Sequence, residues 1–160
     1  MPVLANITII SGGQTGADRA ALDFAIAHGF THGGWCPRGR RAEDGEILPC
    51  YSLRETPSKH YSQRTKWNVR DSDATVVFSA KLQLTGGTRL TYELAQRLGK
   101  PVLLLSRDEH DVQSATAQLR KFVDQHSVHA LNVAGPRASQ EPELGAFVTE
   151  VLAATLINRW

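Results

Sequence analysis

The stretch Ile7-Thr8-Ile9-Ile10-Ser11 runs directly into Gly12-Gly13-Gln14-Thr15-Gly16 and then into Ala17-Asp18-Arg19-Ala20-Ala21-Leu22. A β-branched run, a glycine-rich turn and a helical pattern follow one another without a spacer, which is typical of the strand–turn–helix unit of an α/β protein. Glycines let a phosphate approach the main chain, and the N–H groups at a helix N-terminus attract anions. The stretch therefore predicts an α/β fold with an anion-binding turn.

The residues around this turn exclude two common classes of anionic ligand, dinucleotides and nucleoside triphosphates. Ser11, Gly13 and Gly16 reproduce the spacing of a dinucleotide-binding fingerprint with serine in first place. That fingerprint also needs an acidic residue about 20 positions further on, where the chain has Trp35-Cys36-Pro37-Arg38. The turn also lacks the Gly-Lys-Ser/Thr ending of a nucleoside-triphosphate loop. We expect a phosphorylated ligand of another kind.

Length and composition exclude several classes of protein. The 160 residues suit one domain, residues 1–160, because a chain of about this length buries roughly 68–70% of its unfolded surface. The formal charge of +2 is too small for a dedicated nucleic-acid-binding face. Cys36 and Cys50 form no CxxC pair, which disfavours a disulfide framework and a zinc site. Without a signal-peptide pattern or a run of about 18 apolar residues, we expect a cytoplasmic protein with no membrane span.

Short apolar runs alternate along the chain with segments whose apolar residues repeat at helical spacing. The predicted strands are Ile7–Ser11, Gly34–Cys36, Thr75–Ser79, Val102–Ser106 and Ala130–Ala134. After the helix that begins at Ala17, helical spacing marks Leu90–Leu98, Val112–His126 and Leu144–Thr155. Strands this apolar are expected to be covered on both faces. The pattern predicts a single-domain Rossmann-like α/β fold, with a mostly parallel sheet and helices on both faces.

Residues 37–57 fit this scheme less well. They are rich in Pro, Gly and charge, and an irregular loop of about 20 residues in a compact domain usually has a function or contains a further element. We expect that element to be a short edge strand at Tyr51–Thr56.

The segment Ser58–Asp71 predicts a helix with Ser58 as its N-cap. Arg64, Asn68 and Asp71 lie on one face of this helix. This polar stripe is either a solvated face or one wall of a site.

A second glycine turn, Thr85-Gly86-Gly87-Thr88, follows the Thr75–Ser79 run and leads into another predicted helix. Open α/β sheets bind ligands beyond the carboxyl ends of their strands. We therefore expect the two glycine turns to line one crevice.

Several arginines are candidates for binding an anion there. Arg19 lies in the first turn of a helix, where a cation opposes the macrodipole, so it is compensated either by a bound anion or by Asp23 at i+4. Arg38, Arg40 and Arg41 follow the second predicted strand. They form either a phosphate-binding cluster or a solvated loop, which is balanced by Glu43 and Asp44.

Catalytic residues are harder to find in the sequence. It shows no Ser/His/Asp order, metal-ligand helix motif or paired carboxylates at a meaningful spacing. Glu93 follows the second glycine turn and is either a catalytic carboxylate or an ordinary helix-surface residue. Cys36 is either a soft metal ligand or a buried thiol at a strand end.

An ordered set of motifs resembles one known family. The motifs are IISGGQTGADRAALDFAI, GGWCPRGRRAEDG, Tyr51–Thr56, RTKWNVRDSDATVVF and TGGTRLT. Together they span about residues 7–105 and resemble the molybdenum carrier family, that is, the molybdenum cofactor carrier proteins. These belong to a wider Rossmann-like superfamily that also contains the lysine-decarboxylase-like phosphoribohydrolases.

The resemblance implies a protein that binds the molybdenum cofactor, a phosphorylated pterin, and protects and delivers it without chemical conversion. It also implies homo-oligomers, as dimers or tetramers, with molybdoenzymes or enzymes of cofactor synthesis as partners and no nucleic acid. The residues expected to hold the anionic end of the cofactor, or to lie beside it, come from four segments. They are Gly12, Gly13, Gln14, Thr15, Gly16 and Arg19; Arg38, Gly39 and Arg40; Arg64 and Asn68; and Gly86, Gly87 and Thr88.

Two alternatives remain open at this point. The phosphoribohydrolases use a Pro-Gly-Gly-x-Gly-Thr loop with a glutamate three residues after the threonine, whereas here Thr91 stands three residues after Thr88. This difference favours binding over hydrolysis, unless Glu93 replaces the missing carboxylate. The second alternative is a sensor that binds a nucleotide-derived signal in the same crevice.

Overall fold

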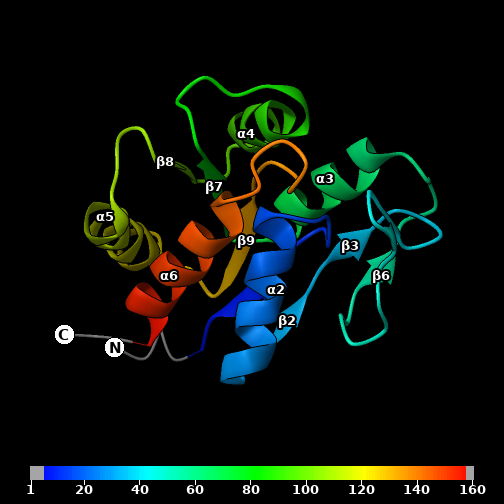
Figure 1. The fold of residues 1–160 in the computed structure, drawn as a ribbon, viewed down its shortest axis with the longest axis horizontal. Helices are drawn as coiled ribbons and strands as arrows, with labels where there is room; N and C mark the ends of the chain where they lie inside the picture. The colour runs from blue at the N-terminus through cyan, green and yellow to red at the C-terminus, as the bar shows by residue number, and fades with distance from the viewer. Residues whose placement is uncertain (1–5, 158–160) are drawn as a thin grey trace.

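The computed structural model describes residues 6–157 and shows an α/β fold built on a five-stranded sheet (Figure 1). The strands are β1 (Thr8–Ile10), β2 (His32–Gly33), β7 (Ala74–Ser79), β8 (Val102–Ser106) and β9 (Ala130–Ala134). They lie in the order β2-β1-β9-β7-β8, and every neighbouring pair is parallel. The predicted fold class is confirmed.

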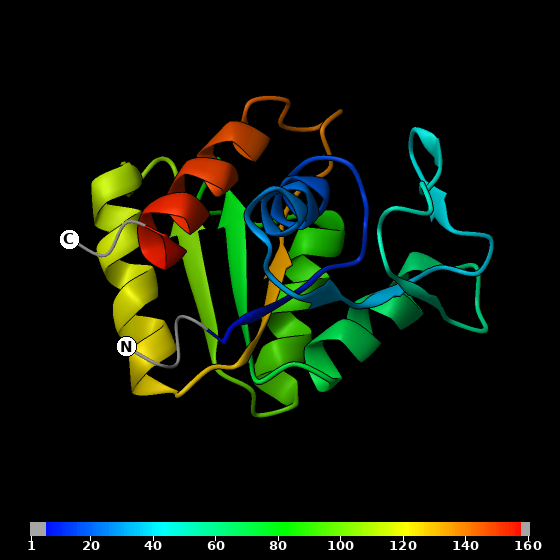
Figure 2. The ribbon, with the colours of Figure 1, turned by 90° about the horizontal axis from the view of Figure 1, so that it is seen from below.

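Five helices in the described residues cover this sheet on both faces (Figure 2). They are α2 (Ala17–His28), α3 (Tyr61–Arg70), α4 (Gly86–Arg97), α5 (Val112–Gln125) and α6 (Leu144–Leu156). On one face α6 packs against both α2 and α5, and on the other face α3 packs against α4. None of the helices within residues 6–157 has the length and apolar character needed to cross a bilayer.

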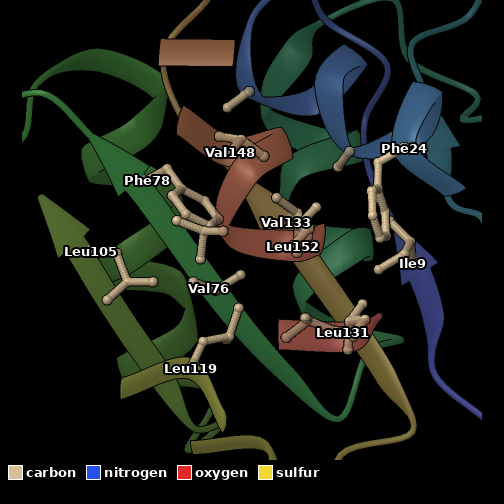
Figure 3. Packing of buried hydrophobic residues seen from close by; sticks show 14 of the residues in the cluster. Ile9, Phe24, Val76, Phe78, Leu105, Leu119, Leu131, Val133, Val148 and Leu152 are labelled. Carbon is tan, nitrogen blue, oxygen red and sulfur yellow. The ribbon is translucent and has the colours of Figure 1, made fainter. Parts of the chain in front are cut away.

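The inner strands of the sheet are apolar because helices cover both of their faces. All six residues of β7 are buried, and Val76, Phe78, Leu131 and Val133 pack against α5 and α6 in one large cluster (Figure 3). The Phe78 ring meets Phe147 edge to face, with 6.0 Å between the ring centroids. The apolar runs at residues 7–11, 75–79 and 130–134 are therefore the three inner strands of a doubly covered sheet, and the run Val102–Ser106 forms the edge strand β8.

The strand order shows that the chain is a permuted form of a familiar topology. β9 is the last strand in the sequence, yet it lies in the middle of the sheet, between β1 and β7. When β9 is counted first, the order becomes 3-2-1-4-5, which is that of the doubly wound dinucleotide-binding sheet. The switch point, where such sheets bind ligands, then lies between β9 and β7.

The second predicted strand needs correction. Gly34 and the residues after it leave the main sheet, because β2 ends at Gly33 and β3 (Trp35–Cys36) pairs instead with β6 (Arg54–Glu55). Gly34 has φ +133°, and a Cβ there would lie 2.2 Å from the Ser11 carbonyl oxygen, so the chain turns at this glycine. β6 confirms a short strand within Tyr51–Thr56, although its partner is β3 and not the main sheet.

The start of α3 also differs from the prediction. The helix begins at Tyr61 with His60 as N-cap, and the Ser58 hydroxyl accepts a hydrogen bond from the His60 N–H, outside the helix. Residues 37–57 contain a small hairpin of β4 (Arg41–Ala42) and β5 (Gly45–Glu46).

Candidate functional site

A cavity of about 190 Å³ opens beside the carboxyl end of β9, at the switch point of the sheet. Its walls come from the first glycine turn, the N-terminus of α4, one side of α3 and the segment after β9. The prediction that both glycine turns line one crevice is confirmed. The predicted site residues on its wall are Gly12, Gln14, Arg64, Asn68, Gly86, Gly87 and Thr88.

Three N–H groups of the first glycine turn, Gly12–Gly16, already have partners inside the protein. The Gly13 N–H donates to the Ser11 hydroxyl at 3.2 Å, and the Gln14 N–H donates to Asp18 Oδ2 at 3.2 Å. The Thr15 N–H donates to Gln14 Oε1 at 3.1 Å. In this structure the N–H groups of Gly13, Gln14 and Thr15 are therefore occupied by side chains of the turn and of Asp18, and that of Gly12 lies on the cavity wall without a partner in the described residues.

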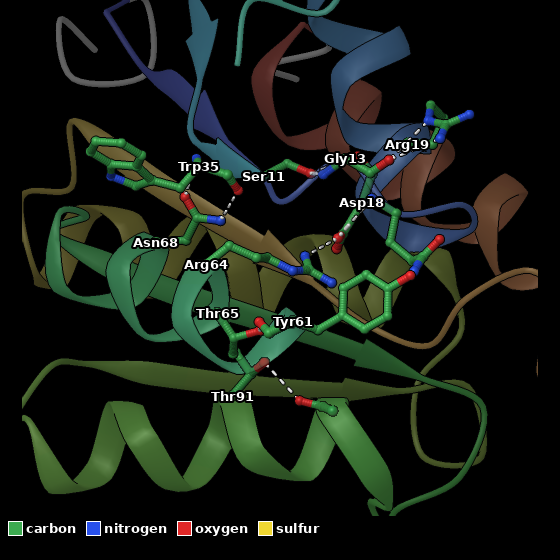
Figure 4. A network of polar contacts seen from close by, with 12 residues as sticks. Ser11, Gly13, Asp18, Arg19, Trp35, Tyr61, Arg64, Thr65, Asn68 and Thr91 are labelled. Atoms are coloured by element: carbon green, nitrogen blue, oxygen red, sulfur yellow. Dashed lines mark hydrogen bonds and ion pairs between the residues drawn. The ribbon is translucent and has the colours of Figure 1, made fainter. Parts of the chain in front are cut away.

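A buried ion pair joins this turn to α3 (Figure 4). Arg64 Nη1 lies 3.0 Å from Asp18 Oδ2, and the two side chains are only 13% and 6% exposed. Burial raises the pKa of the Asp18 carboxyl, and the Arg64 guanidinium opposes that shift. A Cβ on Gly12 would lie 1.7 Å from Arg64 Nη1, so the glycine at this position makes room for the arginine.

The Gln14 side chain has a fixed orientation. Its Oε1 accepts two hydrogen bonds, from the Thr15 N–H at 3.1 Å and from the Glu43 N–H at 2.8 Å. Nε2 is therefore left as a donor, and it is buried without a hydrogen-bond partner, as is Arg64 Nε. Both residues line the cavity. Buried polar groups are almost always paired, so two residues of one cavity wall that each hold an unpaired, buried donor fit an anionic or acceptor-rich ligand.

The N-terminus of α4 adds further donors to the same cavity. The N-cap residue Thr85 makes no side-chain hydrogen bond to the first turn of the helix. A Cβ on Gly86 or Gly87 would meet nothing within 4 Å, so both residues border open space. The first N–H groups of a helix lack partners within the helix and carry the positive end of its dipole. This end of the cavity therefore also favours negative charge.

The structure adds Arg137, which sequence reasoning missed. It lines the cavity from the segment after β9, and its guanidinium lies 5.5 Å from the centre of the Tyr61 ring. Arg64 lies against the same ring at 5.4 Å. One feature of the sequence could have pointed to this segment: Gly135 directly follows the Ala130–Ala134 run, as the other glycine turns follow their strands. In the structure a Cβ on Gly135 would lie 2.7 Å from the Phe78 carbonyl oxygen.

Seven of the predicted site residues are not on the cavity wall: Gly13, Thr15, Gly16, Arg19, Arg38, Gly39 and Arg40. The Arg19 guanidinium donates to the Gly13 carbonyl and pairs with Asp44 at 3.0 Å, so its ion-pair partner is Asp44 and not Asp23.

Arg40 is also held by the protein. Its guanidinium donates to four main-chain carbonyl oxygens of the loop that follows it, those of Ile47, Leu48, Tyr51 and Leu53. In this arrangement Arg40 organises the 37–57 region. A contact between the ligand and any of the seven residues stays a prediction.

Glu93 and Cys36 are both placed away from the cavity wall. Glu93 forms an exposed ion pair with Arg89 at 3.0 Å, four residues before it on the same helix. Cys36 is fully buried in a small apolar cluster with Leu22, Ile47 and Leu53, and burial raises the pKa of its thiol. These positions match the structural alternative for each residue.

Comparisons with known proteins agree with this fold. Residues 9–156 match the family described as Circularly permutated YpsA SLOG. A crystal structure of a "Putative molybdenum carrier protein" from Syntrophus aciditrophicus SB is 44% identical and superposes with a TM-score of 0.93, covering 95% of this chain and 96% of that one. No curated protein matches the chain. With β9 taken as the first strand of its sheet, the chain belongs to the Rossmann-like, circularly permutated YpsA branch of the SLOG family.

Proposed function

We propose that this protein binds the molybdenum cofactor by its phosphate group, and protects and delivers it without chemical conversion. The observation that carries the proposal is the pair of buried, unpartnered donors, Gln14 Nε2 and Arg64 Nε, at one cavity. The α4 N-terminus and the Arg137 guanidinium add positive potential to the same wall. The similarity to a structure described as a molybdenum carrier supports the class of ligand.

The size of the cavity fits one end of such a ligand. Its volume of about 190 Å³ is below the roughly 300–1,000 Å³ typical of pockets that enclose a whole small molecule. A phosphate group at the Gln14 and Arg64 donors would therefore be enclosed, while the rest of the ligand would extend past the α4 N-terminus. Binding of this kind supplies an anchor and leaves the remainder accessible for transfer.

The chemistry of the wall favours binding over hydrolysis. Asp18 is the single carboxylate among the described residues that line the cavity, and it is occupied by Arg64 and by the Gln14 N–H. A general base must be free to take a proton from the reacting group, and at the wall of this cavity the Asp18 carboxylate is not. Glu93, the residue that would have to serve in a phosphoribohydrolase, pairs with Arg89 outside the cavity. Delivery to a molybdoenzyme, the dimeric or tetrameric state and the seven residues off the cavity wall stay predictions.

A single variant tests the anion site. Gln14→Glu keeps an Oε1 acceptor for the Thr15 and Glu43 N–H groups and replaces the free donor by a carboxylate oxygen. Losing a hydrogen bond to a charged group costs about 1.5–3 kcal/mol, so we expect the affinity for the cofactor, followed by its retention on gel filtration, to fall by about 10- to 150-fold. Retention is measured as pterin fluorescence after oxidation.

Gln63→Glu is the matched control. Gln63 lies on α3, accepts the Ser58 N–H at 2.7 Å and is absent from the cavity wall. The control substitution therefore adds the same negative charge outside the cavity. Retention should be unchanged by this control. Equal losses in both variants, or no retention by the unaltered protein, would contradict the proposal. Full displacement of the cofactor by excess AMP would favour the nucleotide sensor or the nucleotide-processing enzyme instead.

A further inference from the structure

A second and larger cavity adjoins the first at the carboxyl end of β7. Its volume is about 620 Å³, and it shares Thr88, Pro136 and Gln140 with the wall of the first cavity. The two cavities therefore lie side by side at the β9–β7 switch point. A ligand whose phosphate lies at Gln14 and Arg64 would extend into the second cavity past Thr88.

The walls of the second cavity combine apolar surface with uncharged polar groups and two charged residues, Lys81 and Glu141. Leu84 and Pro136 offer aliphatic surface, and Gln83 and Gln140 offer amides that both donate and accept hydrogen bonds. Pockets for small organic ligands usually combine apolar walls with a few placed polar groups. This cavity is suited to the ring half of the ligand.

The Glu141 carboxylate on the wall of this cavity favours rings whose edge carries hydrogen-bond donors. Glu141 Oε1 accepts the Ala80 N–H at 2.5 Å, which holds the side chain at the cavity wall. Within residues 6–157 the Glu141 carboxylate makes no other hydrogen bond, so Oε2 is free and Oε1 keeps a second lone pair. The Glu141 carboxylate therefore presents acceptors, and no donor, to whatever occupies the cavity.

We infer that the second cavity binds a pyrimidinone ring that carries an amino group beside its ring N–H, and that Glu141 accepts hydrogen bonds from both. Pterins and guanine share this donor–donor edge. Adenine presents a ring nitrogen acceptor beside its amino group, and that lone pair would face the carboxylate. The inference rests on the proposed function, because the phosphate anchor in the first cavity sets which part of the ligand reaches Glu141.

The test compares four ligands by calorimetry on the full chain: hydroxymethylpterin phosphate, GMP, AMP and ribose phosphate. A good paired contact to a base edge discriminates by roughly 1–3 kcal/mol, so the pterin phosphate and GMP should bind about 5- to 150-fold more tightly than AMP. Comparing the affinity for the pterin phosphate with that for GMP shows which of the two ring systems the cavity prefers. Ribose phosphate lacks a ring of this type and reports the phosphate anchor alone.

Glu141→Gln is the decisive variant, because it keeps an Oε1 acceptor for the Ala80 N–H and replaces the free acceptor by a donor. It should remove most of the preference for the pterin phosphate and GMP over AMP, while leaving the affinity for ribose phosphate unchanged. Equal binding of AMP by the unaltered protein, or an unaltered preference in the variant, would overturn the ring assignment and leave the phosphate anchor standing. No binding of any phosphate compound would overturn both.

Discussion

At the scale of single residues, close approaches between backbone segments decide where the site can form. Gly16, the N-cap of α2, has φ +83°, and a Cβ there would lie 2.5 Å from the Pro136 carbonyl oxygen. Pro136 lies on the walls of both cavities. The glycine therefore allows the first turn and the segment after β9 to meet, and so holds two walls of the site together.

Gly16→Ala should destabilise the protein more than Gly29→Ala, at the other end of the same helix. Gly29 also has a positive φ, +74°, but a Cβ there meets nothing within 4 Å. The left-handed backbone alone costs roughly 1–2 kcal/mol, which should lower the melting temperature by about 2–8 °C in Gly29→Ala. Gly16→Ala adds a clash with backbone, so its loss should be at least about twice as large. Equal losses in thermal unfolding would contradict the assigned contact.

At the scale of elements, the Asn68 side chain makes the two main-chain hydrogen bonds to β3 that a neighbouring strand would otherwise make. Asn68 on α3 accepts the Trp35 N–H at 2.7 Å and donates to the Trp35 carbonyl at 2.9 Å (Figure 4). It is 3% exposed and also lines the first cavity. Two residues of the polar stripe predicted on this helix, Arg64 and Asn68, therefore lie on the cavity wall, and Asn68 also fixes β3 against α3.

The end of α3 is held to β3 by an interaction that depends on pH. Hydrogen bonds to Asp71 from Arg70 and from Trp35 Nε1 lower the pKa of its carboxyl to about 2. Because this pKa is below the unfolded value of about 3.9, the carboxylate stabilises the fold above about pH 4, and the effect is lost as the pH falls towards 2. The side chain is 38% exposed, so solvent screening should keep the contribution below about 1 kcal/mol.

Asp71→Asn should therefore reduce the free energy of unfolding at pH 7, and the difference from the unaltered protein should shrink as the pH falls from 4 to 2. Urea unfolding at several pH values measures it. Asp124→Asn, on the exposed side of α5, controls for the loss of one negative charge. A difference that stays constant with pH, or grows in acid, would show that the Asp71 carboxylate does not stabilise this contact.

The elements themselves could be predicted from the sequence because each is encoded locally. A β-branched run followed by glycine, and the apolar spacing of a helix, do not depend on distant residues. The ion pair of Asp18 with Arg64 could not be predicted, since it joins residues 46 positions apart. The position of Arg40 predicted a phosphate-binding arginine. In the structure its guanidinium donates to four carbonyl oxygens of the following loop, and the sequence of that loop does not reveal these contacts.

At the scale of the whole molecule, chain order and spatial order differ. The sequence makes Ile7–Ser11 look like the first strand of a doubly wound sheet, whereas β9 occupies that central position. Arg137 was missed for this reason, because the segment after β9 was expected at the end of the chain and not beside the switch point. α6 follows β9, runs back against the parallel strands and ends on the side of the sheet where β1 begins (Figure 1).

Since α6 lies where a crossover helix from β9 to β1 would lie, the chain should tolerate a return to the unpermuted order. In the proposed variant, a short Gly/Ser linker joins the two ends of the chain and the new N-terminus is Ser127, in the exposed turn between α5 and β9. Every strand pairing and both cavities are kept, so it should unfold cooperatively and bind phosphate ligands within about threefold of the parent, as expected for cuts at exposed turns. Circular dichroism and calorimetry measure the two properties. A variant that folds but no longer binds would mean that the site depends on the natural chain ends and not on the sheet order alone.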